Sequence, residues 1–401
     1  MTRMMPPADP VPEAPSDRVE LAIPPRVAIV HYWLVGMRGG ERVLEALCDL
    51  FPDADIYTHA LAAERLSEKL RRHNIRTSFV GRLPFAARWY KRYLPLMPLA
   101  IEALDLTGYD LVLCSESGPA KGAILRPGAV QIVYCHSPMR YIWDGYHAYR
   151  ARAGRLTRAL MPVFAHYLRI WDAASAQRAD AIVANSAFVA GRVRRFWRRE
   201  AVIVHPPVDA STFRPVDQEA RGDHYLWCGE LVGYKRADLA IAACTALGRK
   251  LVVIGDGEEM ARLKRHAGAH VTFLGRAPAA VLRDHMARAR ALLFPGEEDF
   301  GLVPVEMQAS GRPVVALARG GALETVVDGE TGLLYTDDSA AGLADAILAF
   351  EASGLEARCT PACLANAARF TPQAFRAGMA RVLAEHGIAL PAPVATPALP
   401  A

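Results

Sequence analysis

Short apolar runs alternate with longer amphipathic stretches through the first half of the chain. The apolar runs lie at 27–30, 111–114, 131–134, 181–184 and 201–204, and helix-like stretches cover 42–51 and 187–197. Apolar runs without a polar face are typical of strands that are buried on both sides of a parallel sheet, and the amphipathic stretches supply the helical crossovers. The pattern therefore predicts a doubly wound, parallel α/β domain.

The same pattern starts again after residue 209. Apolar runs at 225–228, 250–254, 271–274, 291–294 and 313–317 alternate with amphipathic stretches at 237–247, 279–290 and 303–310. This predicts a second α/β domain, and a chain of 401 residues is long enough for two such cores. Ligands of doubly wound sheets bind beyond the carboxyl ends of the strands. Two such domains that face each other enclose a central cleft.

These elements divide the chain into five parts. We expect proline-rich, unstructured tails at 1–25 and 391–401, an N-terminal domain at 26–210, a C-terminal domain at 211–370, and a helix at 371–390 that packs back on the N-terminal domain. Apolar runs stay shorter than a membrane span, and the first residues lack the apolar stretch of a signal peptide. We therefore expect a cytoplasmic protein.

Composition narrows the class of protein further. With 52% apolar and 22% charged residues the chain resembles an ordinary folded protein, which excludes a fibrous or largely disordered one. The seven cysteines form no Cys-x-x-Cys pair and are expected to be small buried side chains in a reducing compartment. The formal charge is +5, with far more arginine than lysine. Codon bias is the simplest source of the arginines, although arginine also binds phosphate with two parallel hydrogen bonds.

The strongest chemical signal lies at 294–306, where a predicted strand ends, a glycine-containing loop turns and a helix begins. Glu298 and Glu306 stand eight residues apart around Gly301. Free backbone N–H groups and the positive end of the helix dipole suit a phosphate, and a glycine lets the backbone approach it closely. Carboxylates on either side of that phosphate can accept hydrogen bonds from sugar hydroxyls. On spacing alone, a helix start with solvated acids remains an equal alternative.

This segment resembles the signature of the retaining family-4 glycosyltransferases, Glu-x7-Glu, and the resemblance extends over about 27–370. It implies the GT-B fold, in which two Rossmann-like domains face a cleft. Three further segments match in order. They are the glycine pair Gly39 and Gly40 after the first strand, His136 after the strand at 131–134, and Gly229 with Lys235 at the start of the second domain. The alternative is an ordinary turn for the glycine-containing segments and a structural histidine for His136.

The resemblance implies a role for each matched residue. Glu306 would hold the ribose hydroxyls of a nucleotide-sugar donor, Glu298 the sugar hydroxyls, and His136 would contact the donor sugar. The backbone of Phe300, Gly301 and Leu302, together with Lys235, would stabilise the departing diphosphate, while the loops of Gly39, Gly40 and Gly229 border it. One position departs from the family: Glu230 stands where many members carry a cation. Arg236, Arg38 or Arg140 are the candidates to replace that cation.

The string at 134–144 resembles bacterial mannosyltransferases of surface-polysaccharide assembly. We therefore expect transfer of mannose from GDP-mannose to a lipid-linked saccharide acceptor, with no cofactor. Asp53-Ala54-Asp55 matches a metal-binding motif of other glycosyltransferases, but it follows a predicted helix and a proline and is interpreted as a turn. The histidines show no metal-ligand spacing, so no metal is expected. The sequence leaves the nucleotide base, the linkage, the acceptor and the oligomeric state open.

Cations and aromatic residues interleave in the segment 82–99, where Arg88, Trp89, Lys91 and Arg92 are the candidates for a membrane or acceptor surface. Such a segment can rest on the inner face of an anionic membrane as a peripheral contact. The segment Arg192 to Arg199 is a second candidate. Helices with solvated arginines and buried aromatics are an even alternative for each. Neither segment belongs to a recognisable nucleic-acid-binding motif, so nucleic acid is not expected as a partner.

Three other functions stay open at this point. The chain could be a glycosyltransferase that uses a UDP-sugar, a GT-B sugar-nucleotide epimerase, or a non-catalytic nucleotide-sugar-binding partner, which the acidic Glu230 would suit. A dehydrogenase is disfavoured because Met260 stands where the third glycine of a dinucleotide fingerprint belongs.

Overall fold

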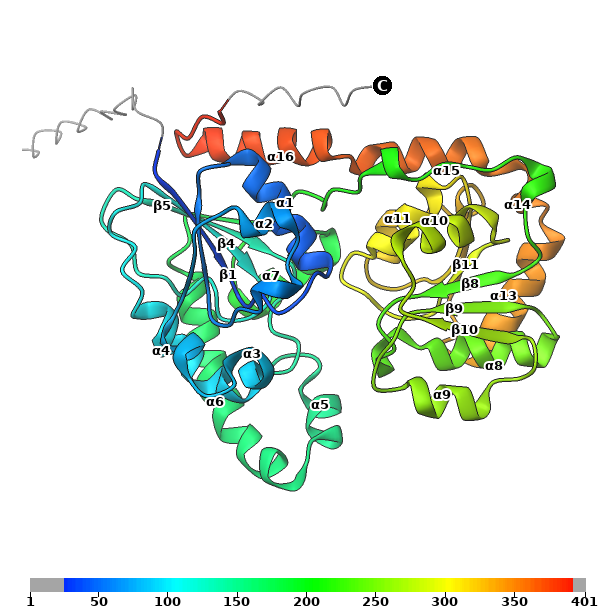
Figure 1. Ribbon diagram of the computed structural model, residues 1–401, viewed down its shortest axis with the longest axis horizontal. Helices are drawn as coiled ribbons and strands as arrows, with labels where there is room; N and C mark the ends of the chain where they lie inside the picture. Colours follow the sequence, from blue (N-terminus) through cyan, green and yellow to red (C-terminus); the bar gives the residue numbers. More distant parts are fainter. Residues whose placement is uncertain (1–24, 392–401) are drawn as a thin grey trace, which may run out of the picture.

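The structure, a computed structural model, describes residues 25–391 and contains two parallel sheets. Figure 1 shows them side by side in two domains. The N-terminal sheet has the order β3-β2-β1-β4-β5-β6-β7. Its strands are β1 (Val27–His31), β2 (Asp55–Thr58), β3 (Ile75–Thr77), β4 (Leu111–Glu116), β5 (Val130–Cys135), β6 (Ala181–Ala184) and β7 (Val202–Ile203). The periodicity missed β2 and β3 because they are short and β3 has no buried residue.

Helices cover both faces of this sheet, and each face has its own apolar core. The helices are α1 (Gly39–Leu50), α2 (Glu68–Arg71), α3 (Ala86–Trp89), α4 (Met97–Glu102), α5 (Tyr146–Arg152), α6 (Arg155–Ala176) and α7 (Ala187–Trp197). Helix α1 begins at Gly39, ahead of the expected residue 42. The side chain of Glu41 accepts a hydrogen bond from the backbone N–H of Arg38 at 2.9 Å, which closes the first turn.

The C-terminal sheet has the order β10-β9-β8-β11-β12-β13, again with every pair parallel. Its strands are β8 (Tyr225–Cys228), β9 (Leu251–Ile254), β10 (Val271–Gly275), β11 (Leu292–Phe294), β12 (Val314–Leu317) and β13 (Gly332–Tyr335). Its helices are α8 (Ala237–Leu247), α9 (Met260–His266), α10 (Ala279–Arg288), α11 (Leu302–Ala309), α12 (Ala322–Thr325), α13 (Ala340–Ala352), α14 (Leu355–Arg358) and α15 (Thr360–Ala367). The prediction of two doubly wound, parallel α/β domains is confirmed.

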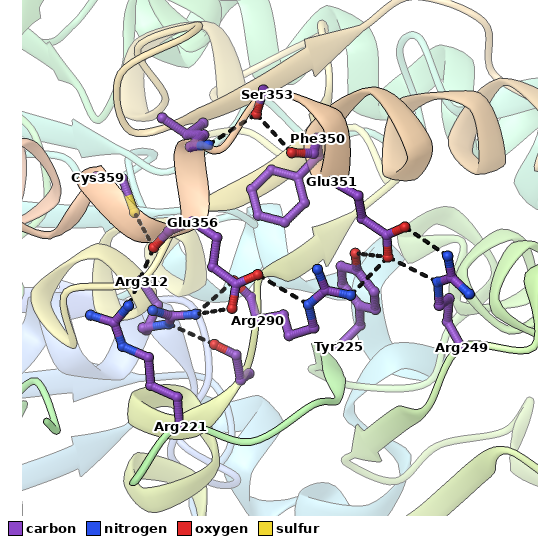
Figure 2. A network of polar contacts seen from close by, with 12 residues as sticks. Arg221, Tyr225, Arg249, Arg290, Arg312, Phe350, Glu351, Ser353, Glu356 and Cys359 are labelled. Carbon is purple, nitrogen blue, oxygen red and sulfur yellow. Dashed lines mark hydrogen bonds and ion pairs between the residues drawn. The ribbon is translucent and has the colours of Figure 1, made fainter. Parts of the chain in front are cut away.

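Arginines fasten the helices α13 and α14 to the C-terminal sheet, as Figure 2 shows. Arg249 and Arg290 both contact the carboxylate of Glu351 at 2.8 Å. Arg290 and Arg312 hold Glu356 at 3.0 and 2.9 Å. The hydrogen bond from Arg249 is the largest of several contacts that lower the pKa of Glu351 to about 2. Part of the arginine excess therefore has a structural use in this domain, apart from any ligand.

The last helix crosses from the second domain back to the first. Figure 1 shows α16 (Pro372–Glu385) lying along the N-terminal domain. Its residues Phe375, Met379 and Val382 are buried in the core that also contains residues of β1 and β4. The chain thus links the two domains twice, once near residue 208 and once before α16. The two connections hold the carboxyl ends of the two sheets near each other.

Candidate active site

The carboxyl-end loops of the two sheets touch each other across the domain boundary. Arg42 on α1 forms an ion pair with Glu306 on α11. Arg38 lies 3.7 Å from Glu230, and Arg140 lies 3.6 Å from Glu297. In each pair the N-terminal domain supplies the cation and the C-terminal domain the acid. The matched segments of the sequence therefore meet at one place, as the GT-B arrangement requires.

The loop before α11 presents the helix N-terminus to this boundary. Gly301 is the residue before the helix and has φ of 85°, a left-handed conformation that glycine adopts at low cost. No side chain among residues 25–391 caps this helix end. The first N–H groups of α11 are therefore available to an anion. The side chain of Phe300 is buried against His205 and Phe370, so only the Phe300 backbone can serve a ligand.

Lys235 and Glu298 lie beside this helix end and contact each other. The Lys235 ammonium is 2.8 Å from a carboxylate oxygen of Glu298, and both side chains are mostly buried. Burial is the largest single influence on Lys235 and acts to lower its pKa. The charge of Glu298, the hydrogen bond to it and the nearby Tyr234 together outweigh burial and leave the pKa above its usual value. Lys235 is thus a fixed cation. To accept a hydrogen bond from a ligand, Glu298 would have to exchange this partner or share it.

The candidate glycines Gly39, Gly40 and Gly229 differ in how closely their neighbours approach. A Cβ atom on Gly39 would lie 3.1 Å from Cδ1 of Leu302, across the domain boundary. A Cβ atom on Gly40 would lie 2.3 Å from the hydroxyl oxygen of Tyr32. Gly229 has φ of 151° and lies against the side chain of Lys235. A side chain is therefore excluded by space at Gly40, would press on Leu302 at Gly39, and is disfavoured by the backbone conformation at Gly229.

His136 follows β5 and is half-buried on the opposite side of the boundary. Burial lowers its pKa to about 3, with a smaller contribution from His31. The histidine is therefore neutral at physiological pH. Its Nε2 lies 2.8 Å from the hydroxyl of Ser115 at the end of β4. That hydroxyl also lies 2.9 Å from Nδ1 of His31 at the end of β1. The sequence reasoning missed His31 and Ser115, although both are polar residues that end buried strands.

Glu306 is buried and its partner is Arg42, whose side chain is 55% exposed. A buried carboxylate with one exposed partner can accept another donor when that partner moves. The sequence could not indicate this pair, because the two residues are 264 positions apart. Arg236, one of three candidates for the second diphosphate cation, instead contacts Asp338 at 2.8 Å. Arg38 and Arg140 are the two candidates whose side chains reach the site.

The second basic segment, Arg192 to Arg199, is divided between the surface and the interior, with Arg194, Arg195 and Arg198 exposed and Arg192 and Trp197 buried. The Arg192 side chain is only 7% exposed and contacts Asp299 and Asp144 at 2.6 Å each. Trp197 is buried and donates its ring N–H to Asp172 at 2.7 Å. Periodicity placed these residues on a helix but did not reveal which side of it faces the C-terminal domain. Arg192 therefore joins the two domains beside the candidate site.

The first basic segment is at the surface. Arg88, Lys91 and Arg92 are exposed, and Trp89 is half-buried with Arg92 over its ring at 4.9 Å. The neighbouring Phe85 and Leu99 are 65% and 61% exposed. The segment packs beside α6, because Trp171 of α6 donates a hydrogen bond to Glu102 of α4 at 2.9 Å. Figure 1 shows α3, α4, α5 and α6 together at one end of the N-terminal domain.

Helix α6 carries a second exposed surface that the sequence reasoning missed. We call it the α6 apolar face. Its large side chains recur at helical spacing and are 39–74% exposed: Leu156, Leu160, Val163, Phe164, Tyr167 and Ile170. Amphipathic periodicity usually indicates the side that a helix buries, and here the other side is apolar as well. An exposed apolar stripe of this length indicates an interaction surface.

Two further findings concern metals and membrane spans. Within residues 25–391 no group of three or more His, Cys, Asp or Glu side chains is placed to hold a metal ion. Asp53 lies in a turn and Asp55 begins β2, so the Asp-x-Asp motif has no third ligand beside it in this part of the chain. No helix in the same part is both long enough and apolar enough to cross a bilayer.

Two facing Rossmann-like domains, with a helix N-terminus, a lysine and two glutamates at their boundary, define the GT-B class. Solved structures agree on the fold. The Anabaena protein HepE, in complex with UDP and glucose, superposes with a TM-score of 0.67 at 17% identity and covers 89% of this chain and 99% of that one. A sucrose-phosphate synthase from Thermosynechococcus elongatus superposes with a TM-score of 0.68 at 18% identity, covering 90% and 98%.

Sequence comparison identifies the family. A model described as Glycosyltransferase Family 4 matches residues 37–212, and one described as Glycosyl transferases group 1 matches residues 222–352. The two models cover most of the chain in the order of its domains. The chain therefore belongs to the family-4 glycosyltransferases with the GT-B fold.

The sequence identity to individual relatives is modest, between 24% and 32% for the three proteins described next. The D-inositol 3-phosphate glycosyltransferase of Mycobacterium leprae is 30% identical over 220 residues, which cover 48% of this chain and 51% of that protein. The alpha-1,3/1,6-mannosyltransferase of Schizosaccharomyces pombe is 24% identical over 378 residues, covering 79% and 72%. A GDP-mannose-dependent alpha-(1-6)-phosphatidylinositol monomannoside mannosyltransferase of Mycolicibacterium smegmatis is 32% identical over 185 residues, covering 38% and 48%. The chain thus spans about half the length of the mycobacterial relatives it matches.

Proposed function

We propose that the protein is a retaining glycosyltransferase that moves mannose from GDP-mannose to a lipid-linked saccharide, without a metal or cofactor. The observation that carries the proposal is the contact between Lys235 and Glu298 beside the free N-terminus of α11. A cation and backbone N–H groups at one point are suited to a diphosphate. Two of the relatives are mannosyltransferases, and the name of one includes GDP-mannose and a lipid acceptor.

Each part of the donor has a complementary group. The diphosphate lies at the α11 N-terminus with Lys235, and the ribose hydroxyls donate to Glu306 after Arg42 moves aside. The sugar hydroxyls lie between Glu298 and His136, which come from opposite domains. Arg38 and Arg140 supply the second cation in place of the family residue at Glu230. These roles are supported by the placement of Glu298 and Lys235 on the C-terminal edge and of the neutral His136 on the N-terminal edge.

The reaction is a single displacement on one face of the sugar. The bond between the sugar anomeric carbon and the diphosphate oxygen breaks, and the acceptor hydroxyl oxygen bonds to the same carbon from the same side. The proton of that hydroxyl passes to the departing phosphate oxygen. Lys235 and the α11 N-terminus stabilise the negative charge that develops on the diphosphate. The contact of Arg192 with Asp299, which the donor does not use, holds the domains together during this step and helps to exclude water.

The acceptor carries a lipid, and the N-terminal domain offers a surface for the membrane. Helix α6, which carries the α6 apolar face, contacts α4 and lies at the same end of the N-terminal domain as the basic segment that contains Arg88, Lys91 and Arg92 (Figure 1). No acidic residue occurs between positions 77 and 101 or between positions 145 and 171. A basic, apolar surface complements the anionic inner face of a bilayer, and each nearby cation contributes about 1 kcal/mol. A second copy of the chain would bring like charges together.

Vesicle flotation tests this membrane contact. The triple variant Leu156→Glu/Val163→Glu/Ile170→Glu should lose binding to vesicles that contain anionic lipid, because the inserted carboxylates oppose both insertion and the surface charge. Leu348→Glu on α13 is the control, since Leu348 is also exposed but lies in the other domain. Unchanged flotation of the triple variant, or a dimer that only this variant disrupts, would overturn the membrane assignment.

Donor binding and transfer test the enzymatic proposal. We expect GDP-mannose to bind more tightly than UDP- or ADP-sugars in a calorimetric titration. The bound donor should then label a lipid-linked saccharide extract, and EDTA should not change the rate. Donor turnover without an acceptor would indicate an epimerase. Donor binding without transfer to any lipid-linked acceptor would indicate a non-catalytic partner.

A further inference from the structure

A buried chain of polar contacts leads from helix α1 to His136. It runs from Glu41 through His31 and Ser115 to His136. Parallel pairing places His31 and Ser115 opposite each other at the ends of β1 and β4, and His136 follows the adjacent β5. His31, Ser115 and Glu41 are at most 1% exposed. Such a chain has few arrangements of its protons that satisfy every group, since water cannot supply the missing partners.

The Ser115 hydroxyl fixes the relation between the two imidazoles. Its oxygen lies 2.9 Å from Nδ1 of His31 and 2.8 Å from Nε2 of His136. A hydroxyl has a single proton, so Ser115 donates to one imidazole and accepts from the other. The hydrogen bonds in this chain of contacts can therefore run in either of two directions. In one direction His136 carries its proton on Nε2, and in the other it carries it on Nδ1.

Glu41, at the far end of this chain of contacts, selects the direction of the hydrogen bonds. Nε2 of His31 is buried, has no hydrogen-bond partner in the described part of the chain, and lies 3.9 Å from a carboxylate oxygen of Glu41. A lone pair on Nε2 would face a buried carboxylate, whereas an N–H there is attracted to it. His31 in its neutral form therefore carries its proton on Nε2. Its Nδ1 then accepts from Ser115, and the Ser115 oxygen accepts from Nε2 of His136.

We propose that Glu41, His31 and Ser115 are positioning residues that hold His136 as a hydrogen-bond acceptor toward the donor sugar. With its proton on Nε2, His136 keeps a lone pair on Nδ1. That atom then accepts a hydrogen bond from one sugar hydroxyl. The consequence is donor selection, because a sugar that lacks this hydroxyl leaves the acceptor unmatched. This inference rests on the proposed function for its substrate, but the state of His136 can be measured without any substrate.

The first test is the tautomer of His136 in the whole protein. Long-range nitrogen–proton NMR spectra of protein with ¹⁵N-labelled histidine distinguish a protonated from an unprotonated ring nitrogen, and a His136→Gln variant assigns the signals. We expect an unprotonated Nδ1 and a protonated Nε2 at neutral pH. A proton on Nδ1, whether the ring is neutral or charged, would overturn the proposal. This result does not depend on whether the protein transfers mannose.

The second test uses Ser115→Ala, which removes the middle of the chain. We expect kcat/KM for GDP-mannose to fall about threefold to tenfold, the fold-change of one net hydrogen bond. For the monodeoxy donor that lacks the contacted hydroxyl, the variant and the unaltered protein should have equal kcat/KM. An equal loss with every deoxy donor would show a merely structural role and contradict the proposal.

The protein offers a matched control for Ser115→Ala at another buried serine. His59 contacts the hydroxyl of Ser78 at 2.9 Å, and both are buried in the same domain. Ser78→Ala thus removes a buried serine–histidine contact that is separate from the proposed chain. It should leave the His136 tautomer and the preference among deoxy donors unchanged. If Ser78→Ala changed that preference as much as Ser115→Ala does, the effect would reflect packing.

Discussion

The two sheets that meet at the candidate site share one strand order, but each carries a polar cluster of a different electrostatic character at its edge. On the N-terminal edge, the Ser115 hydroxyl contacts both His31 and His136, and neither Ser115 nor His136 is charged. On the C-terminal edge, Lys235 and Glu298 form an ion pair. Neutral contacts of this kind suit the hydroxyls of a sugar, and charges suit a diphosphate. Under the proposed function, each domain would thus recognise a different part of one donor.

The two edges also differ in how ready they are for a ligand. The contacts of His136 lie within the N-terminal domain and need no rearrangement. Glu306 and Glu298 already have cationic partners, so a ligand has to replace or share them. The N-terminal edge is thus preorganised, whereas the C-terminal edge exchanges one set of charged contacts for another. The following substitutions test this difference, beginning with the largest expected effect.

Lys235→Ala should lower kcat about 100-fold to 1000-fold, because it removes a buried cation that stabilises the leaving diphosphate. Lys250→Ala is the matched control in the same domain, since Lys250 forms an ion pair with Asp223 but is 62% exposed. Steady-state transfer assays of both variants check the prediction. Equal activities would place the diphosphate elsewhere.

Arg192→Met should lower the free energy of unfolding by about 3–5 kcal/mol, because it leaves Asp299 and Asp144 without their buried partner. Arg194→Met on the same helix should have a far smaller effect, since its contact with Glu200 is exposed. Denaturant unfolding measures both changes. Similar stabilities of the two variants would contradict a structural role for Arg192 at the domain boundary.

The neutral state of His136 predicts a pH dependence of stability. Its pKa is lowered from 6.5 to about 3 by burial, so the unfolded chain binds a proton before the folded protein does. The folded state therefore loses stability as the pH falls from about 6.5 towards 3. Unfolding curves of the protein and of His136→Gln should converge as the pH falls. Parallel curves would indicate that His136 titrates normally.

Arg42→Ala should have the smallest effect, a twofold to fivefold tighter binding of the donor. The exposed Arg42 contributes about 1 kcal/mol at most through its ion pair with Glu306, and the ribose has to displace it. Titration calorimetry measures the change. Weaker binding would show that Arg42 itself contacts the donor.

The sequence predicted the framework of the fold and site well, for a physical reason. Strands buried on both faces carry few polar positions, and the polar residues at or after their last positions lie at the carboxyl edge. Lys235, Glu298, Glu306 and His136 could be identified from that rule and from the family resemblance. His31 and Ser115 obey the same rule, and applying it to every buried strand would have found them.

The missed features depend on tertiary contacts. Arg42 and Glu306, like Arg192 and Asp299, are far apart in the sequence, and their pairing depends on how the domains meet. The α6 apolar face was missed because periodicity shows that a helix has an apolar side but not whether another element covers it. Short strands such as β3 carry too few buried residues to produce a pattern.

The most direct test of the account is mannosyl transfer by the Glu298→Ala/Glu306→Ala double variant. The protein is given GDP-mannose and a lipid-linked saccharide extract, and thermal unfolding confirms that the variant is folded. We predict that the unaltered protein forms a product with retained anomeric configuration and that the double variant loses transfer almost completely. Full activity of the folded double variant would contradict the assignment of the site.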